Sequence, residues 1–414
     1  MTFTQKWARL ALLNLVVLAF VGVLLRYKIL FPLPWVDHKH LLHGHSHFAF
    51  SGWVSTALYV ALIHVLKPSI LQQKQFNNLL WAQQISSYGM LFTFPFMGYA
   101  VPSIAFSTLS ILVSFWFTAL AWKQIISSQH ITFQKKWFYA ALVCNVVSSA
   151  GTLTLAWLMA NKILHQSLYF GSVYFYLHFQ YNGWFLFTVF GLLLLYAQPW
   201  INRLQQRFSN YFFWLLVISI LPAWFLSMLW MRLPEWMHYA GIAAVTFQLL
   251  ALYYMGRLVW QLRNFLQHST NGLVKWMWLF SIMAFVLKII LQSFSAVPEL
   301  NKYAFGIRPI VIGFLHLVLL GFVSMFILGS FIQSNLLHTK QAAATKAVWI
   351  FITGLILNEV TLMLQGIAAI SFTDAPYANY ILLLAALTMF SGLLALLLQQ
   401  KSPARNDRAA LSMP

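Results

Sequence analysis

Charged side chains are scarce in this sequence, and acidic ones are the scarcest. Only 7% of the 414 residues are charged and 61% are hydrophobic, whereas a soluble domain has about a quarter charged residues. This scarcity excludes an ordinary soluble protein. The chain also has a single cysteine, Cys144, so it can form no internal disulfide, and it has neither a C-x-x-C pair nor a C-x-x-C-H site for covalent haem attachment.

Long apolar stretches account for most of the remaining sequence. A stretch of about 20 apolar residues crosses a hydrocarbon core of roughly 30 Å. The sequence therefore predicts an all-α membrane protein, with a single polytopic domain over residues 1–400 and a cytoplasmic tail over 401–414. Because the first stretch is long and lacks a small-residue cleavage site, we expect a membrane span rather than a signal peptide. Twelve such stretches lie near 8–27, 45–66, 78–100, 103–122, 138–160, 174–197, 211–231, 237–258, 276–295, 309–332, 347–370 and 379–398.

The net charge of +19 is a topology signal. Most Lys and Arg residues lie near the two termini or in even-numbered loops, the side that cytoplasmic loops usually occupy. We therefore expect both termini in the cytoplasm of a bacterial inner membrane, and no nucleic-acid partner. The odd-numbered loops, by contrast, hold four of the six acidic residues, namely Asp37, Glu235, Glu299 and Asp374.

One short pattern occurs three times: a histidine, four residues, a glycine and a large aromatic residue. It reads His47-FAFS-Gly52-Trp53, His178-FQYN-Gly183-Trp184 and His316-LVLL-Gly321-Phe322, with separations of 131 and 138 residues. The three copies fall in expected spans two, six and ten, each running inward from the outer face. Repeats in membrane proteins often place a site at the interface between them. The pattern predicts a pseudo-threefold bundle with four helices in each repeat.

Histidines at this depth are candidate ligands. An ionisable side chain within a span is costly and usually faces the bundle interior, and neutral imidazole is a common ligand of metals and of haem iron. A single histidine near the interface is more often an ordinary interface residue. Three histidines at corresponding places favour ligation.

Twelve spans in threefold order, with histidines in spans two, six and ten, resemble the haem–copper oxidase subunit I superfamily. The nearest branches are the cbb3-type oxidases and the nitric oxide reductases. The resemblance implies a non-covalent b-type haem held in low-spin form by His47 and His316, with His45 as the alternate ligand. It also implies that His178 binds copper, and His45 could serve a second site with His178.

A second resemblance is to the NnrS-like haem- and copper-containing membrane proteins linked to nitric oxide stress. These proteins have about this length, twelve spans and an H-x-H pair at span two, matched here by His45 and His47. Phe48 stands where that family usually has an acidic residue. Both resemblances imply haem.

The copper and high-spin haem ligands of the oxidase pattern are incomplete. Phe314 replaces one histidine of the span-ten pair, and Asn182 replaces the tyrosine found four residues after the span-six histidine. The histidine pair of span seven has no counterpart, and only His238 lies nearby. A copper site needs several converging nitrogen ligands, so a weak copper or second haem site depends on whether His178 and His238 meet. Turnover of the oxidase or nitric oxide reductase type is left open as an enzyme activity.

Glu359 and Lys288 are the other candidate site residues, because both lie within expected spans. Such residues are functional hypotheses by default. They could pair with each other, line a proton path or extend their ends toward the interface.

The sequence thus predicts a haem-binding inner-membrane protein that transfers electrons or binds nitric oxide or dioxygen. A redox partner or accessory subunit is expected beside the lipid bilayer. The competing classes are a secondary transporter, which also favours many spans and internal repeats, and a cofactor-free structural or assembly relative.

Overall fold

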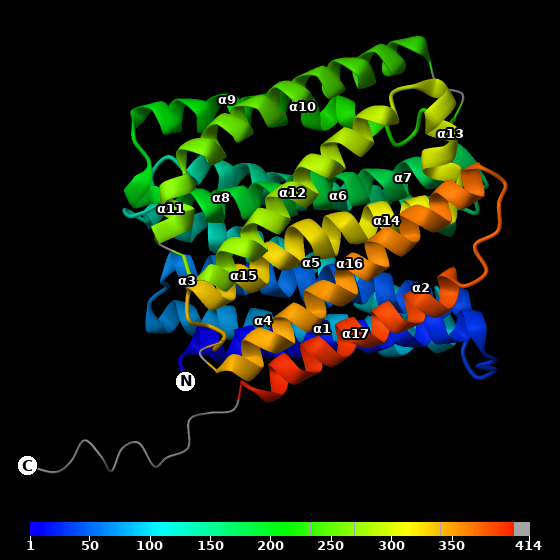
Figure 1. The fold of residues 1–414 in the computed structure, drawn as a ribbon, viewed down its shortest axis with the longest axis horizontal. Helices are drawn as coiled ribbons and strands as arrows, with labels where there is room; N and C mark the ends of the chain where they lie inside the picture. The colour runs from blue at the N-terminus through cyan, green and yellow to red at the C-terminus, as the bar shows by residue number, and fades with distance from the viewer. Residues whose placement is uncertain (232–233, 269, 340, 401–414) are drawn as a thin grey trace, which may run out of the picture.

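The computed structural model describes residues 1–231, 234–268, 270–339 and 341–400. The expected tail, 401–414, lies outside the described residues. The described chain is helical throughout and has no strand. Its helices run roughly parallel to one another in one elongated bundle (Figure 1). The N-terminus and the last turn of the final helix lie at the same end of the bundle.

The helices fall into three groups that follow the expected repeats. The first group is α1 (Phe3–Leu30), α2 (His38–His47), η1 (Phe48–Ser55), α3 (Thr56–Leu66), α4 (Ile70–Met97) and α5 (Val101–Ser127). The second is α6 (Lys135–Ala160), α7 (Gln166–His178), η2 (Phe179–Phe185), α8 (Leu186–Tyr196), η3 (Gln198–Trp200), α9 (Arg203–Phe225), α10 (Glu235–Gln261) and the short α11 (Arg263–His268). The third is α12 (Gly272–Phe294), α13 (Pro298–Gly306), α14 (Arg308–His316), η4 (Leu317–Ser324), α15 (Met325–Gln333), α16 (Ala342–Ile370) and α17 (Ala378–Leu398).

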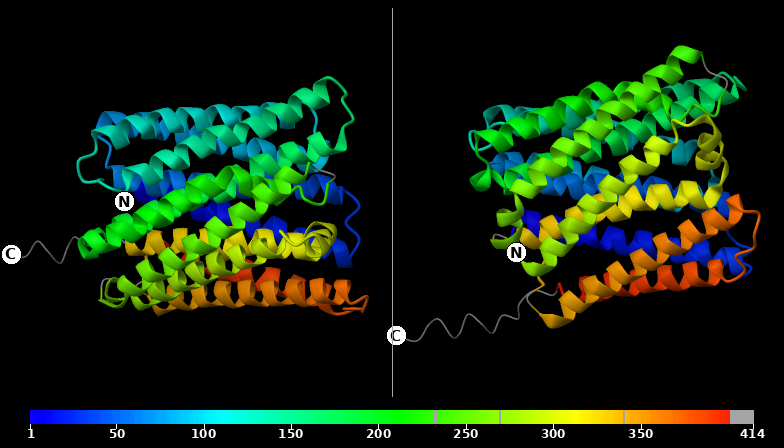
Figure 2. Two further views of the ribbon diagram at one scale, coloured as in Figure 1. Left: turned by 90° about the horizontal axis from the view of Figure 1, so that it is seen from above. Right: turned by 45° about the horizontal axis from the view of Figure 1, so that its top comes forward.

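The three groups close on one another around a common centre. Helix α5 contacts α6, α10 contacts α12, and α17 contacts α1, so each group touches the next. At the centre, η4 contacts both η1 and η2, and the Phe50 ring on η1 lies 5.6 Å from the Phe185 ring on η2. The right-hand view of Figure 2 shows the first helix (blue) and the last helix (red) side by side, as their contacts require. The arrangement supports the threefold repeat, while the oxidase-type bundle stays a prediction.

A π-helical segment follows each histidine of the repeated pattern. The segments begin at Phe48, Phe179 and Leu317, directly after His47, His178 and His316. The three starting points therefore have the same spacing as the histidines. π-Helical turns are rare and occur frequently at functional sites. The sequence repeat thus has a matching repeat in the backbone.

Polar side chains donate hydrogen bonds to carbonyl groups within these wider turns. The Ser51 carbonyl accepts a hydrogen bond from Gln83 Nε2 at 2.8 Å, and the Gly52 carbonyl accepts one from Asn14 Nδ2 at 2.6 Å. In the third repeat, Ser281 Oγ donates to the Phe322 carbonyl at 2.6 Å. Because unpaired buried carbonyls are costly away from water, these side chains stabilise the π-helical segments.

Eleven helical segments in the described residues are long and apolar enough to cross a membrane. Several present large apolar side chains outward, such as Trp260 on α10, which is 68% exposed. An exposed apolar surface of this kind is typical of contact with lipid, so the fold is that of a helical membrane protein. Helix α4, which covers most of the expected span 78–100, is not among the eleven. Its many Gln and Asn side chains lower its hydropathy, and the twelfth span stays a prediction.

The second span begins earlier than the sequence indicates. The sequence predicts a span over 45–66, but the continuous helix runs from His38 to Leu66. The three closely spaced histidines, His43, His45 and His47, therefore lie within a helix rather than at its mouth. Their side chains point in directions that the helical period sets.

Candidate functional site

A cavity lies between the first and third repeats. Its walls come from α1, the helix formed by α2 and η1, the helix formed by α14 and η4, and the later helices α16 and α17. The cavity has a volume of about 210 Å³, and its empty space including the part open to the outside is about 1280 Å³. Ligand pockets usually measure about 300–1,000 Å³, so a large organic ligand would occupy the open part as well as the enclosed part. Leu15, Leu25, Leu315, Phe351 and Met389 are among the side chains that make its walls apolar.

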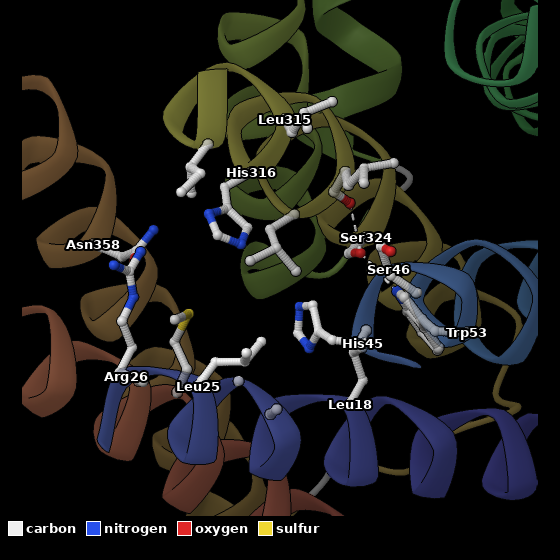
Figure 3. Close-up of a pocket in the computed structure, with 18 of the residues that line it drawn as sticks. Leu18, Leu25, Arg26, His45, Ser46, Trp53, Leu315, His316, Ser324 and Asn358 are labelled. Atoms are coloured by element: carbon white, nitrogen blue, oxygen red, sulfur yellow. Dashed lines mark hydrogen bonds between the residues drawn. The ribbon is translucent and has the colours of Figure 1, made fainter. Parts of the chain in front are cut away.

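His45 and His316 both line this cavity. His45 comes from α2 in the first repeat and His316 from the end of α14 in the third, and both rings point into the cavity (Figure 3). The Nδ1 atom of each ring is buried and has no hydrogen-bond partner. Because buried polar atoms are nearly always paired, these two ring nitrogens at one cavity are candidate contacts for a ligand.

The helical period explains why His45 faces the cavity. His38, Leu42, His45 and Ala49 recur every three or four residues and all line it. Asp37 caps the start of α2 by accepting a hydrogen bond from the His40 backbone N–H at 2.9 Å. That bond stabilises the charged carboxylate and lowers the pKa of Asp37. The cap therefore helps fix where this histidine-bearing face begins.

Two arginines add positive charge to the same cavity. Arg26 on α1 and Arg308 on α14 both line it, and Arg308 Nη2 lies 3.1 Å from Nε2 of His38. Within the described residues, neither guanidinium forms an ion pair with a carboxylate. Glu359 is the acidic side chain that interacts electrostatically with Arg26. The Glu359 carboxylate accepts a hydrogen bond from Asn358 Nδ2 at 3.0 Å. Arg26 is half-buried and Arg308 is exposed, and guanidinium groups pair readily with carboxylates, so this end of the cavity is suited to a ligand with acidic groups.

His47 occupies the opposite face of α2. Two residues along a helix turn the side chain by about 200°, so His45 and His47 cannot point into the same space. The His47 ring stacks on Phe94, with centroids 4.4 Å apart and planes inclined by 14°. Its Nε2 lies 3.3 Å from the Tyr99 hydroxyl. The structure thus places His45, which was the alternate expected ligand, at the same cavity as His316. His47, which was the first choice, lies outside that cavity.

His178 belongs to a separate buried group in the second repeat. Its Nε2 lies 2.6 Å from the Ile220 carbonyl and its Nδ1 lies 3.0 Å from Asn182 Nδ2. Lys288 donates a hydrogen bond to Asn182 Oδ1. His178 therefore shares neither the cavity nor a contact with His45.

The remaining candidates lie apart from one another. His238 lines a small pocket with Glu235 and Tyr239 that does not include His178. Lys288 bonds to Asn182, so it does not pair with Glu359 as the sequence allowed. In the part of the chain that the structure describes, no three His, Cys, Asp or Glu side chains gather closely enough to hold a metal ion.

Sequence reasoning missed the two cavity arginines and His38. Arg26 and Arg308 look like loop residues in the hydropathy pattern, although both lie in helices. The available signal was the seven-residue spacing of His38 and His45, which places two side chains on one helical face.

Comparisons with known proteins give no family for the chain. No protein-family model matches it, and no curated protein is significantly similar to it.

Proposed function

We propose that the protein binds a non-covalent b-type haem in the cavity between the first and third repeats, with His45 and His316 as the axial ligands. The observation that carries this proposal is that one apolar cavity, lined also by Arg26 and Arg308, holds two buried ring nitrogens without a hydrogen-bond partner, the Nδ1 atoms of His45 and His316. Each feature matches one part of a haem: the iron, the flat apolar ring and the two carboxylates.

The cavity residues fit such a group in their chemistry. Neutral imidazoles are common haem-iron ligands, and guanidinium groups bind carboxylates through paired hydrogen bonds. Arg26, Arg308 and His38 would hold the acidic groups, and the leucines of α1 and α14 would cover the ring and exclude water. When bound, haem would supply one-electron redox chemistry.

Electron transfer is the activity that two histidine ligands favour, because both axial positions of the iron are then filled by the chain. Binding of nitric oxide or dioxygen at this site would require one histidine to leave the iron. A redox partner or an accessory subunit would deliver or accept the electron.

The membrane arrangement belongs to the same proposal. The N-terminus and the end of α17 lie at one end of the bundle (Figure 1), which requires an even number of crossings. This supports twelve spans, with α4 as the twelfth, in a bundle like that of haem–copper oxidase subunit I. The distribution of Lys and Arg favours a bacterial inner membrane with both termini in the cytoplasm. The cavity arginines then lie toward the periplasmic side.

A visible spectrum of the purified full-length protein tests the haem assignment. We expect a Soret band of low-spin type, and its loss or conversion to high spin in His45→Ala and in His316→Ala. His47→Ala is the matched control, because His47 lies two residues away and faces Phe94. Low-spin haem that is lost in His47→Ala and kept in His45→Ala would reject the ligand assignment. A colourless protein, even when haem is supplied, would reject haem binding, and solute transport in vesicles would then assign a transporter.

A further inference from the structure

The buried group around His178 stands at the position that corresponds to the cavity histidine of the third repeat. His178 and His316 each precede a π-helical segment. In the resemblance to haem–copper oxidases, the span-six histidine binds copper through a free ring nitrogen. The hydrogen bonds of His178 show whether such a nitrogen is free here.

Both ring nitrogens of His178 are already in use. The Ile220 carbonyl can only accept, so His178 Nε2 carries the proton and donates to it at 2.6 Å. The Nδ1 atom is then the acceptor, and it receives a hydrogen bond from Asn182 Nδ2 at 3.0 Å. The imidazole therefore has no lone pair left for a metal ion.

Lys288 fixes the direction of this network. Its amino group donates to Asn182 Oδ1, which orients the amide so that its NH₂ group faces His178. Lys288 and His178 are each 2% exposed, and Asn182 is 7% exposed. Each step from Lys288 through Asn182 and His178 to the Ile220 carbonyl joins one donor to one acceptor. A connected buried network of this kind restrains its side chains.

Neighbouring side chains supply no alternative metal ligands. The Tyr181 ring packs against Phe314, with centroids 6.3 Å apart, and Phe314 stands where the oxidase pattern has a histidine. His238 lines a different pocket. A copper ion at His178 would also lie near the amino group of Lys288, which repels it when protonated. The residues present do not fit a copper ion.

We propose that Lys288, Asn182 and His178 form a metal-free polar centre at the place where haem–copper oxidases bind copper on the corresponding histidine. The centre joins α12 to the second repeat through side-chain hydrogen bonds alone. The protein then has no copper partner for reduction of dioxygen or nitric oxide at this position. This inference does not depend on whether haem binds between His45 and His316.

Copper loading of the full-length protein tests the centre. The purified protein is incubated with Cu(I) under reducing conditions and, separately, with Cu(II), then desalted, and copper is counted per chain for the wild type and for His178→Gln. Equal copper content is expected. One copper ion more per chain in the wild type than in His178→Gln would overturn the proposal.

A second arm keeps the test decisive if His178→Gln does not accumulate. The variant His43→Gln/His45→Gln/His47→Gln/His316→Gln removes the imidazole pair beside Tyr99 and the two cavity imidazoles with unpaired ring nitrogens, and it is loaded with Cu(II) in the same way. Stoichiometric copper with imidazole nitrogen coupling in its electron paramagnetic resonance spectrum would overturn the proposal, and its absence would support it.

The structural role of the amino group has its own readout. Lys288→Met removes the donor to Asn182 and should lower the thermal midpoint of the protein in detergent. Lys346→Met, which removes an exposed cation, is the control and should leave the midpoint unchanged. An unchanged midpoint in Lys288→Met would contradict the proposed network.

Discussion

Trp53 donates a hydrogen bond from its indole Nε1 to Oγ of Ser324 across 2.7 Å. The two residues lie in η1 and η4, so the bond joins the π-helical segments of the first and third repeats. Ser324 Oγ in turn donates to the Leu319 carbonyl at 2.7 Å. Both Trp53 and Ser324 line the cavity that holds His45 and His316. This bond therefore fixes the two histidine-bearing helices relative to each other.

Removing this inter-repeat bond should destabilise the protein. Ser324→Ala leaves the buried indole N–H of Trp53 without a partner, at a cost of about 1–3 kcal/mol. The control is Ser219→Ala, because Ser219 is similarly buried and its hydroxyl donates to the Leu216 carbonyl of its own helix at 3.0 Å. The measurement is the unfolding free energy in detergent. A loss in Ser219→Ala as large as that in Ser324→Ala would contradict a special role for the inter-repeat bond.

Two of the three repeat glycines, Gly183 and Gly321, should differ in their tolerance of a methyl group. A Cβ atom at Gly183 would lie 2.5 Å from the Cys144 Cβ, whereas one at Gly321 would lie 3.2 Å from the Ala284 Cβ. We expect Gly183→Ala to cost roughly 1–3 kcal/mol through overpacking, and Gly321→Ala to cost less. Thermal unfolding of the two variants gives the comparison.

Cys144 provides the rescue for that experiment. The double variant Gly183→Ala/Cys144→Gly removes the Cβ that the new methyl group would meet, so it should recover stability relative to Gly183→Ala. Comparison with Cys144→Gly alone separates rescue from the cost of the new glycine. Additive losses in the double variant would mean that the Cys144 contact is not the cause.

The sequence predicted the repeat but not which histidine faces the cavity. The spacing of His47, His178 and His316 matches the spacing of the three π-helical segments. His45 and His47 belong to opposite faces of α2, however, and a single sequence does not show which face meets α14. Alignment of the three repeats indicates His47 as the ligand. In the structure, α2 packs against α4, and His47 therefore faces Phe94.

Other site residues were hidden by their position near helix ends. Arg26 and Arg308 were counted among loop residues because charge normally ends an apolar stretch. In the structure, α1 continues to Leu30 and α14 begins at Arg308, so both arginines reach the cavity. The hydrogen bond between Lys288 and Asn182 could not be predicted from the sequence either, since it joins residues that are 106 positions apart.

Filling the cavity from α1 should block haem without replacing either proposed ligand. Gly22 lines the cavity, and a Cβ atom there would first meet the His45 ring, at 3.5 Å. Gly22→Leu places an apolar side chain in that space, so the folded protein should be retained and the haem content should fall. Absorbance at the Soret band per chain measures this loss.

Gly256→Leu is the control for that change. Gly256 lies on α10, and a Cβ atom there would have no neighbour within 4 Å. The control should keep a full haem complement. If Gly22→Leu binds as much haem as Gly256→Leu does, the ligand does not lie against α1.

The two cavity arginines should control haem affinity rather than the spin state of the iron. Arg26→Gln and Arg308→Gln each remove a charged donor to an acidic group of the ligand. A hydrogen bond to a charged group contributes about 1.5–3 kcal/mol, so the Kd should rise roughly ten- to hundredfold in each variant. Titration of the apoprotein with haem gives the Kd, and the low-spin spectrum at saturation should be unchanged, since His45 and His316 are intact.

Arg257→Gln separates this effect from a general loss of positive charge. Arg257 lies on α10 and contacts Tyr253 Oη at 3.2 Å, away from the cavity, so its replacement should leave the Kd unchanged. Equal weakening in Arg257→Gln would indicate long-range attraction of an acidic ligand. Unchanged affinity in both cavity variants would mean that the acidic groups point away from Arg26 and Arg308. A haem dimethyl ester should bind the wild type more weakly than haem binds either single arginine variant, because it lacks both carboxylates that the two guanidinium groups pair with.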